Sequence, residues 1–238
     1  MKDIEVTSKK LRPFFPYYGS KWGMARHMPP PRHERVVECF AGAAGYSTYW
    51  GSRNVTLVDT DPIIAGLWDY LIHADAERIL ELPNLPNAGD SVEGYQLLDA
   101  EKWLIGFWLN RGSATPKKTR TAYSARSDKG QLNWGEKAKA RIVGQLDAIR
   151  DWKVVNKSFD SVDISASTWV IDPPYEDKGR YYRHSFSDYE GLAKFARRLP
   201  GQVMVSENEG ATWMDFSPLG GFKATRGRTK EVIWIGGN

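Results

Sequence analysis

The segment Asp172-Pro173-Pro174-Tyr175 constrains the fold of this chain more than any other. Each proline fixes φ and removes a backbone donor, and each keeps the residue before it out of the helical region. The apolar run from Thr168 to Ile171 therefore predicts a buried strand that ends abruptly. A carboxylate, backbone carbonyls and an aromatic ring would project from that strand end. Together they can accept both hydrogens of a nucleobase amino group while the ring stacks on the base. The alternative interpretation is a strand that prolines terminate beside an ordinary tyrosine.

Short apolar runs alternate with stretches of helical periodicity along the rest of the chain. The runs that predict strands are 36–40, 55–58, 152–155, 169–171, 202–205 and 232–235, and the stretches that predict helices are 61–72, 94–109, 136–149 and 188–199. Asp61-Pro62 is a typical helix start, with an acid at the N-cap and proline in the first turn. Alternating strands and helices predict an α/β protein with a three-layer, Rossmann-like sheet.

Composition limits the class of protein. With 238 residues, 41% hydrophobic and 26% charged, the chain is long enough for one globular domain, with or without an insertion. Cys39 is the one cysteine, so no intramolecular disulfide can form. No apolar run approaches the roughly 20 residues that span a bilayer, and no cluster has metal-ligand spacing. We therefore expect a cytoplasmic protein, of bacterial or phage origin, that works without a membrane or a metal.

Positive charge is concentrated in the middle of the chain. Between Arg111 and Lys153, eleven Lys or Arg residues stand against four Asp or Glu, so this segment carries +7 while the whole chain carries +4. From Asn110 to Gly135 the helical periodicity disappears and small polar and basic residues dominate, which indicates an insertion. Such a segment suits a phosphate backbone, although a solvated basic surface has the same composition. We expect one domain of residues 1–109 and 151–238, with an insertion of residues 110–150.

Two features at the ends of the first two predicted strands indicate a nucleoside site. In the turn from Glu38 to Gly45, Gly42 and Gly45 let a ligand approach the backbone, and the following helix offers free N–H groups. A tight strand-to-helix connection would have the same sequence. Asp59 follows about 20 residues later, where an acid accepts hydrogen bonds from ribose hydroxyls. Asp61 is better explained as the N-cap of the next helix.

A third feature precedes the first predicted strand. The segment from Phe15 to Trp22 joins aromatic side chains to a turn at Gly19 and to Lys21. Aromatic rings can flank a nucleoside or its sulfonium group, and Lys21 can pair with a carboxylate. An N-terminal arm packed on the sheet is the alternative interpretation.

In their order along the chain, these residues resemble the motifs of the Dam family of DNA adenine N6-methyltransferases. Tyr17 to Lys21 is similar to the family's N-terminal S-adenosylmethionine motif, and Glu38 to Gly45 resembles its Glu-Pro-Phe-x-Gly-x-Gly segment. Asp59 matches the ribose-binding acid, and Asp172 to Tyr175 matches the catalytic Asp-Pro-Pro-Tyr. Ser158 to Asp160 stands where the family has residues lining the adenine end of the cofactor. The resemblance spans nearly the whole chain.

The sequence departs from the family pattern at several positions. Cys39 replaces a proline, Ala44 stands at the second glycine and Ser20 replaces another glycine. Residues 109–112 and 130–135 resemble parts of the family's DNA-recognition region, but the fuller Asn-Arg-x-x-x-Asn-Gly pattern is missing. The resemblance therefore implies the class of cofactor more strongly than the target sequence.

The resemblance implies a Rossmann-like methyltransferase sheet with a small, basic DNA-recognition insertion. It implies that S-adenosylmethionine is used to methylate adenine N6 in double-stranded DNA, after the base flips out of the duplex. The residues implied in catalysis are Asp172, Pro173, Pro174 and Tyr175. Those implied in cofactor binding are Tyr17, Tyr18, Gly19, Lys21, Glu38, Phe40, Gly42, Gly45, Asp59, Phe159 and Asp172. Those implied in DNA binding are Arg111, Lys117, Lys118, Arg120, Arg126 and Asn133.

Other functions fit the same residues. Similar Pro-Pro-aromatic motifs serve methyltransferases that act on RNA or on a protein amide nitrogen, and the altered glycine turn is compatible with a DNA-binding homologue without turnover. The aromatic and basic stretch from Tyr181 to Phe186 is either a flap over the flipped base or a packed loop. No oligomeric state is predicted.

Overall fold

The computed structural model describes residues 9–109, 112–126, 133–176, 183–223 and 228–237. Its strands are β1 (Arg35–Cys39), β2 (Asn54–Val58), β3 (Lys153–Val155), β4 (Ser167–Ile171), β5 (Gly201–Asn208), β6 (Ser217–Lys223) and β7 (Arg228–Gly236). Its α-helices are α1 (Gly45–Trp50), α2 (Pro62–His73), α3 (Ala76–Glu81), α4 (Asp99–Leu109), α5 (Ala122–Arg126), α6 (Glu136–Val143) and α7 (Tyr189–Arg198). Short 3₁₀ helices are η1 (Ala25–His27), η2 (Val92–Gly94) and η3 (Leu146–Ile149).

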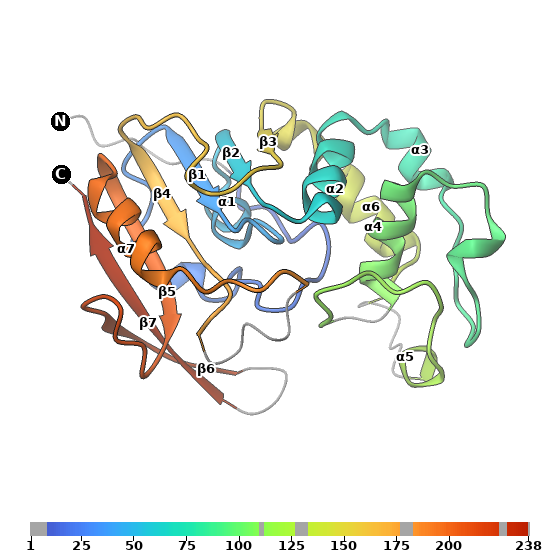
Figure 1. Cartoon of the computed structure of the whole chain (residues 1–238). Helices are drawn as coiled ribbons and strands as arrows, with labels where there is room; N and C mark the ends of the chain where they lie inside the picture. Colours follow the sequence, from blue (N-terminus) through green and yellow to red (C-terminus); the bar gives the residue numbers. More distant parts are fainter. Residues whose placement is uncertain (1–8, 110–111, 127–132, 177–182, 224–227, 238) are drawn as a thin grey trace.

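The strands form one sheet in the order β3-β2-β1-β4-β5-β7-β6 (Figure 1). The first five in this order run parallel, and β7 is antiparallel to both β5 and β6. This mixed, mostly parallel α/β sheet is compatible with the predicted Rossmann-like fold. The strand order reverses between β1 and β4, and ligands of open α/β sheets bind at such a switch point, beyond the carboxyl ends of the strands.

Strand β6 is the one strand of the sheet that the sequence pattern does not predict. It contains Pro218, Gly220 and Gly221, and its pairing with β7 shifts register between Pro218 and Gly220. Proline and glycine weaken a central strand, but an edge strand tolerates them because one of its sides needs no ladder partner. The last place in the sheet therefore explains both the composition of β6 and its absence from the predicted strands.

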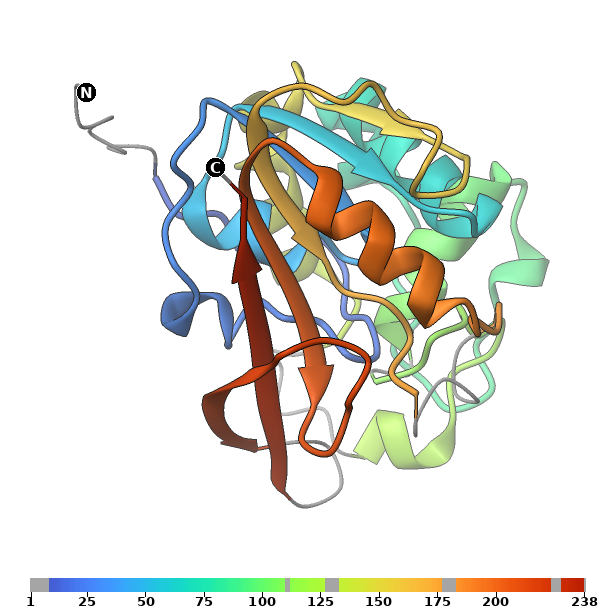
Figure 2. The same cartoon turned by 60° about the vertical axis from the view of Figure 1, so that its left-hand side comes forward.

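Alternate residues of the central strands face two separate cores. Val36 and Val170 pack into the larger core, which also contains residues of α1, α2, α4 and α6. Val37 and Ile171 pack into a second core, against residues of α7. Figure 2 shows α7 on one face of the sheet and the other helices on the far side. The predicted three layers are therefore present.

Helix α2 begins as the sequence predicts and fixes the turn after β1. The Asp61 carboxylate accepts a hydrogen bond from Ile63 N at 2.9 Å, and Pro62 occupies the first turn. Farther along this helix, the buried Trp68 donates its indole N–H to Gly42 O at 2.7 Å. The packing of α2 on the sheet therefore helps to hold the turn that contains Gly42 in place.

The C-terminal part of the predicted insertion, residues 110–150, packs into the main body of the protein. Trp134, Ile142 and Ile149 are buried in the larger core together with the sheet. The Lys139 ammonium is also buried, and it donates to two carbonyls at the end of α3 at 2.8 and 3.0 Å. Helix α6 thus packs on α3 as part of the main body, because its lysine stems bury apolar surface although its composition is basic.

Within the described part of the chain, no helix combines the length and the apolar character needed to cross a membrane.

Gly45 is where the N-terminal segment meets the turn after β1. A Cβ atom added there would lie 2.7 Å from Trp22 N and 2.9 Å from Lys21 N. Two backbone segments therefore approach each other more closely than any side chain permits. The close approach that Gly45 permits is made by the backbone of Lys21 and Trp22, and its predicted contact with a cofactor stays a prediction.

We predict that Gly45→Ala lowers the free energy of unfolding by about 1–3 kcal/mol through overpacking, although alanine favours helices. Urea unfolding measures this change. The matched control is Gly94→Ala, because a Cβ at Gly94 meets no atom within 4 Å, and such open positions usually change stability by less than about 0.5 kcal/mol. Equal stability of the two variants would contradict the close approach.

Candidate functional site

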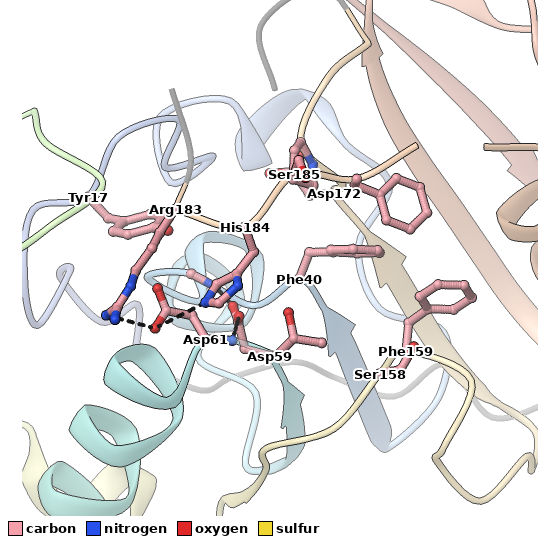
Figure 3. A pocket seen from close by; sticks show the side chains of 14 residues that line it. Tyr17, Phe40, Asp59, Asp61, Ser158, Phe159, Asp172, Arg183, His184 and Ser185 are labelled. Atoms are coloured by element: carbon pink, nitrogen blue, oxygen red, sulfur yellow. Dashed lines mark hydrogen bonds and ion pairs between the residues drawn. The ribbon is translucent and has the colours of Figure 1, made fainter. Parts of the chain in front are cut away.

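A pocket lies beyond the carboxyl ends of β1, β2 and β4, at the switch point of the sheet (Figure 3). Seven residues that the sequence implicates in catalysis or cofactor binding line it: Tyr17, Phe40, Gly42, Asp59, Phe159, Asp172 and Pro174. They come from segments up to 155 positions apart in the sequence, Tyr17 to Asp172. The fold therefore brings together the residues that the separate motifs predict.

The turn after β1 has an unusual backbone. Phe40, Gly42 and Ala44 all have positive φ, at 57°, 49° and 47°. A non-glycine residue in this region typically costs about 1 kcal/mol or more, and such strain persists where the surroundings enforce it. Here Gly42 N donates to Asp59 Oδ2 at 3.0 Å, and the Tyr17 ring lies against Gly42. The turn is thus held in a shape that aims the Phe40 side chain into the pocket (Figure 3).

Glu38 builds this turn and does not line the pocket. Its carboxylate accepts hydrogen bonds from Tyr46 N at 3.2 Å, Ser47 N at 3.0 Å and Ser47 Oγ at 2.6 Å. Burial raises the pKa of Glu38 to about 7, although these hydrogen bonds oppose the rise. The predicted cofactor contact of Glu38 is therefore wrong for this side chain, which anchors the start of α1.

Asp59 joins the turn after β1 to the turn after β2. Its second carboxylate oxygen, Oδ1, accepts from Asp61 N at 2.9 Å. Burial raises the pKa of Asp59 to about 6, and the bonds from the Gly42 and Asp61 amides oppose the rise. Each carboxylate oxygen can accept more than one hydrogen bond, so Asp59 retains acceptor capacity for a ligand hydroxyl.

The wall beside Asp59 and Asp61 comes from residues that the cofactor motifs do not include (Figure 3). Arg183 Nη1 lies 3.8 Å and His184 Nε2 lies 3.9 Å from Asp61 Oδ1 (Figure 3). The pocket encloses about 170 Å³, less than the roughly 300–1,000 Å³ of most small-molecule sites. The pocket as it stands is therefore smaller than a nucleoside-sized ligand needs.

The N-terminal segment is packed on the core, as the alternative interpretation has it, and still contributes to the pocket. Phe15 stacks on Phe107 with ring centroids 5.2 Å apart, and Tyr17 makes an edge contact with the same ring at 5.7 Å. Tyr18 and Gly19 do not line the pocket. Of the predicted aromatic contacts with a cofactor, the geometry supports Tyr17.

Lys21 is turned toward the Asp-Pro-Pro-Tyr turn. Its Nζ lies 2.9 Å from Asp172 Oδ2, 3.1 Å from Gly19 O and 4.5 Å from the centroid of the Tyr175 ring. The predicted pairing of Lys21 with a carboxylate is therefore made with Asp172, and its part in cofactor binding stays a prediction. This pair joins the N-terminal segment to the end of β4.

Asp172 has one occupied oxygen and one free oxygen. Oδ2 pairs with Lys21, whereas Oδ1 is buried and has no hydrogen-bond partner among the described residues. Burial raises the pKa of Asp172, and the ammonium of Lys21 and the nearby hydroxyl of Tyr175, which donates to Glu231, oppose that rise. A buried acceptor without a donor is costly, so Oδ1 is suited to bind a donor that arrives with a ligand.

Three residues outside the predicted motifs hold the turn that Asp172 begins. Tyr189 donates its hydroxyl to Pro174 O at 2.7 Å, and Tyr175 donates its own to Glu231 Oε2 at 2.5 Å. Glu207 accepts from the backbone N of the residue after Tyr175 at 3.4 Å. Glu207 and Glu231 each adjoin the apolar run of a predicted strand, which indicates that these acids are buried. The sequence does not indicate that both contact the turn at Tyr175.

The six residues predicted to contact DNA differ in how exposed they are. Lys117, Lys118 and Arg126 are exposed, and Lys118 pairs with Glu93 at 2.9 Å. The phosphate contact predicted for Arg120 is wrong, because this side chain is 2% exposed and donates to Leu85 O at 2.8 Å.

Two further residues complete this set. Asn133, the predicted base reader, is half-buried and donates to Ser124 O at 3.3 Å. Arg111 lies outside the described residues. The group that remains on the surface is therefore smaller than the sequence predicts.

Among the described residues, no group of three or more His, Cys, Asp or Glu side chains is arranged to hold a metal ion.

Comparison with known proteins adds little to this geometry. No family model matches the chain, and no curated protein matches it. Among solved structures, a conserved hypothetical protein from Streptococcus pyogenes is similar over 84% of each chain, with 13% identity and a TM-score of 0.34. A likeness this weak supports no conclusion about fold or function.

We predict that part of the pH dependence of stability comes from Glu38. Its pKa is about 7 in the folded chain against an ordinary 4.5, so between these values the folded state keeps a proton that the unfolded state releases. Its contribution is therefore complete below pH 4.5 and is lost as the pH rises through about 7. Relative to the Glu38→Gln variant, the wild type should lose on the order of 2–3 kcal/mol across this range. Urea unfolding at several pH values measures the difference, and a constant difference would contradict the assignment.

Proposed function

We propose that this protein transfers a methyl group from S-adenosylmethionine to N6 of adenine in double-stranded DNA. The observation that carries the proposal is the free, buried Oδ1 of Asp172 at the switch point of the sheet. It lies on the residue that begins the Asp-Pro-Pro-Tyr turn, and that residue also lines the pocket with Asp59 and Phe40. The resemblance to the Dam motifs supplies the class of reaction, and the geometry supports it.

The target amine needs two acceptors. Adenine N6 is a poor nucleophile because its lone pair is delocalised into the ring, so the site must draw the amine toward tetrahedral geometry. Asp172 Oδ1 accepts one N–H, and the Pro173 carbonyl accepts the other. Pro173 O has no hydrogen-bond partner among the described residues, whereas Pro174 O receives the hydroxyl of Tyr189. Fixed acceptors of this kind lower the barrier by orientation and electrostatics.

Lys21 and Tyr175 complete the target side of the site. Lys21 holds Asp172 Oδ2, so the carboxylate keeps Oδ1 turned to the base. Tyr175 stacks on the extruded adenine. Because the Lys21 ammonium lies over one face of the Tyr175 ring, the base uses the other face. Stacking offsets part of the few kcal/mol that extrusion of a base costs.

The chemistry of the residues that line the pocket suits a nucleoside. Asp59 binds ribose hydroxyls with its remaining acceptor capacity, and the positive φ of Gly42 lets the backbone lie close to the ligand. Phe40 and Phe159 stack on each other with centroids 5.5 Å apart, so an adenine ring lies beside this pair rather than between its members. When bound, S-adenosylmethionine supplies the electrophilic methyl group.

The DNA approaches from the carboxyl edge of the sheet. Helix α5 lies on the same side of the molecule as the carboxyl ends of β4 and β5 in both views (Figure 1, Figure 2). It carries Arg126 and the exposed Tyr123, and Lys117 precedes it in the chain. These cations neutralise phosphates and hold the duplex while the base is extruded.

The first test compares methyl acceptors. The wild type should transfer tritiated methyl groups to DNA, and not to RNA or protein offered in parallel. Asp172→Asn should lower this activity by about 100-fold or more, because the amide cannot replace a carboxylate acceptor, while S-adenosylmethionine binding measured by calorimetry persists. Asp147→Asn, at a fully exposed carboxylate, is the control and should retain activity. Transfer to RNA or protein alone, or full activity of Asp172→Asn, would overturn the proposal.

The second test concerns the DNA surface. Replacement of Lys117 and Arg126 together by Gln should reduce the steepness of the dependence of log K on log salt by about 2, since each phosphate contact contributes about 0.9. Fluorescence anisotropy with a DNA duplex measures this slope. The control is Lys194→Gln on α7, which also removes an exposed cation. An unchanged slope in the double variant would place these residues off the interface.

A further inference from the structure

Tyr175 is held at both ends. At its backbone, the prolines before it limit the conformations of the turn. At the far end of its ring, the hydroxyl donates to Glu231 Oε2. Both side chains are buried, each residue being 7% exposed. The ring therefore has a fixed partner inside the protein and is not free to rotate as a surface tyrosine is.

Glu231 comes from the antiparallel part of the sheet. It lies on β7 opposite Asn208 of β5 and Gly220 of β6. A buried carboxylate costs free energy unless donors compensate it, and the Tyr175 hydroxyl is one of its donors. An acid in the middle of a three-strand ladder is therefore costly for folding alone, and its contact with a residue of the proposed target site points to a role there.

The backbone of the turn is held independently of Glu231. Tyr189 fixes the Pro174 carbonyl, and Glu207 fixes the amide after Tyr175. Loss of the Glu231 carboxylate therefore removes one restraint on the Tyr175 ring without releasing the turn that carries Asp172. This separation makes the contribution of Glu231 measurable.

We propose that Glu231 is a positioning residue that sets the orientation of the Tyr175 ring for stacking on the target base. Torsion about χ2 of a tyrosine is broad, so the prolines alone leave the plane of the ring unfixed. The hydroxyl oxygen lies on the χ2 axis, but its O–H bond prefers the plane of the ring, so an acceptor fixed at Glu231 favours one ring plane. The Lys21 ammonium lies over one face of the Tyr175 ring. The hydrogen bond to Glu231 holds the ring so that its other face keeps a single orientation. The base then enters in a single orientation relative to Asp172 Oδ1. The inference rests on the proposed function, because it assigns the stacking partner of that site.

The kinetic test uses a DNA duplex that contains the site methylated by the wild type. Glu231→Ala and Tyr175→Phe should each lower kcat about tenfold with unchanged affinity for S-adenosylmethionine. The double variant should be no slower than either single variant, because both changes remove one interaction. Glu231→Gln keeps an acceptor oxygen and should restore most of the activity. Glu209→Ala, at an exposed acid paired with Lys230, is the control and should leave kcat unchanged.

A second measurement does not depend on activity. Nuclear magnetic resonance of ¹³C-labelled tyrosine should show slow flipping of the Tyr175 ring in the wild type and fast flipping in Glu231→Ala. If the wild type methylates DNA but Glu231→Ala keeps full kcat, or if ring flipping is the same in both proteins, the role of Glu231 is refuted. If the wild type methylates no DNA, the proposed function fails, and the ring measurement still decides whether Glu231 fixes Tyr175.

Discussion

The ion pair between Lys21 and Asp172 is the contact on which the site depends. It joins an N-terminal segment to the end of β4 at 2.9 Å, with both side chains largely shielded from water. The close approach of the N-terminal backbone to Gly45 brings Lys21 into reach. Removing one partner of such a pair leaves an uncompensated charge and costs far more than the pair contributes. The pair thus makes the glycine turn, the N-terminal segment and the Asp-Pro-Pro-Tyr turn one structural unit.

Buried acids surround this unit, and their charges are compensated in two different ways. Burial raises the pKa of Glu38 and Glu207 to about 7 and that of Asp59 to about 6. Glu38, Asp59 and Glu207 accept backbone N–H donors, which oppose the rise. In Asp172 a side-chain cation does so, and one oxygen is left over. This difference separates a carboxylate that shapes a turn from one that can accept hydrogens from a ligand, and it is why Asp172 rather than the other acids carries the proposed chemistry.

The sequence predicts those parts of the fold and the site that depend on local chemistry. Asp61 caps α2 because acid followed by proline suits a helix start, and apolar runs became strands because burial on both faces demands them. Contacts between distant segments were not predictable. Three examples depend on tertiary packing: the close backbone contact at Gly45, where no Cβ fits, the burial of Arg120 beneath a loop, and the hydrogen bond of Glu231 with Tyr175. The sequence does not show whether a basic side chain in such a segment donates to a carbonyl of the protein, as Arg120 does, or to a phosphate.

The sheet divides the proposed reaction between its two halves. The parallel strands β1 and β2 end in turns that supply Phe40, Gly42 and Asp59, whereas the antiparallel strand β7 supplies Glu231. Strand β4 lies between them, and its end carries Asp172. A parallel strand presents its carboxyl end to the switch point, but an antiparallel neighbour runs past that edge and can place a side chain beyond it. The reversed direction of β7 therefore allows an acid in mid-strand to reach Tyr175, so that a base and a nucleoside can be held on opposite sides of one carboxylate.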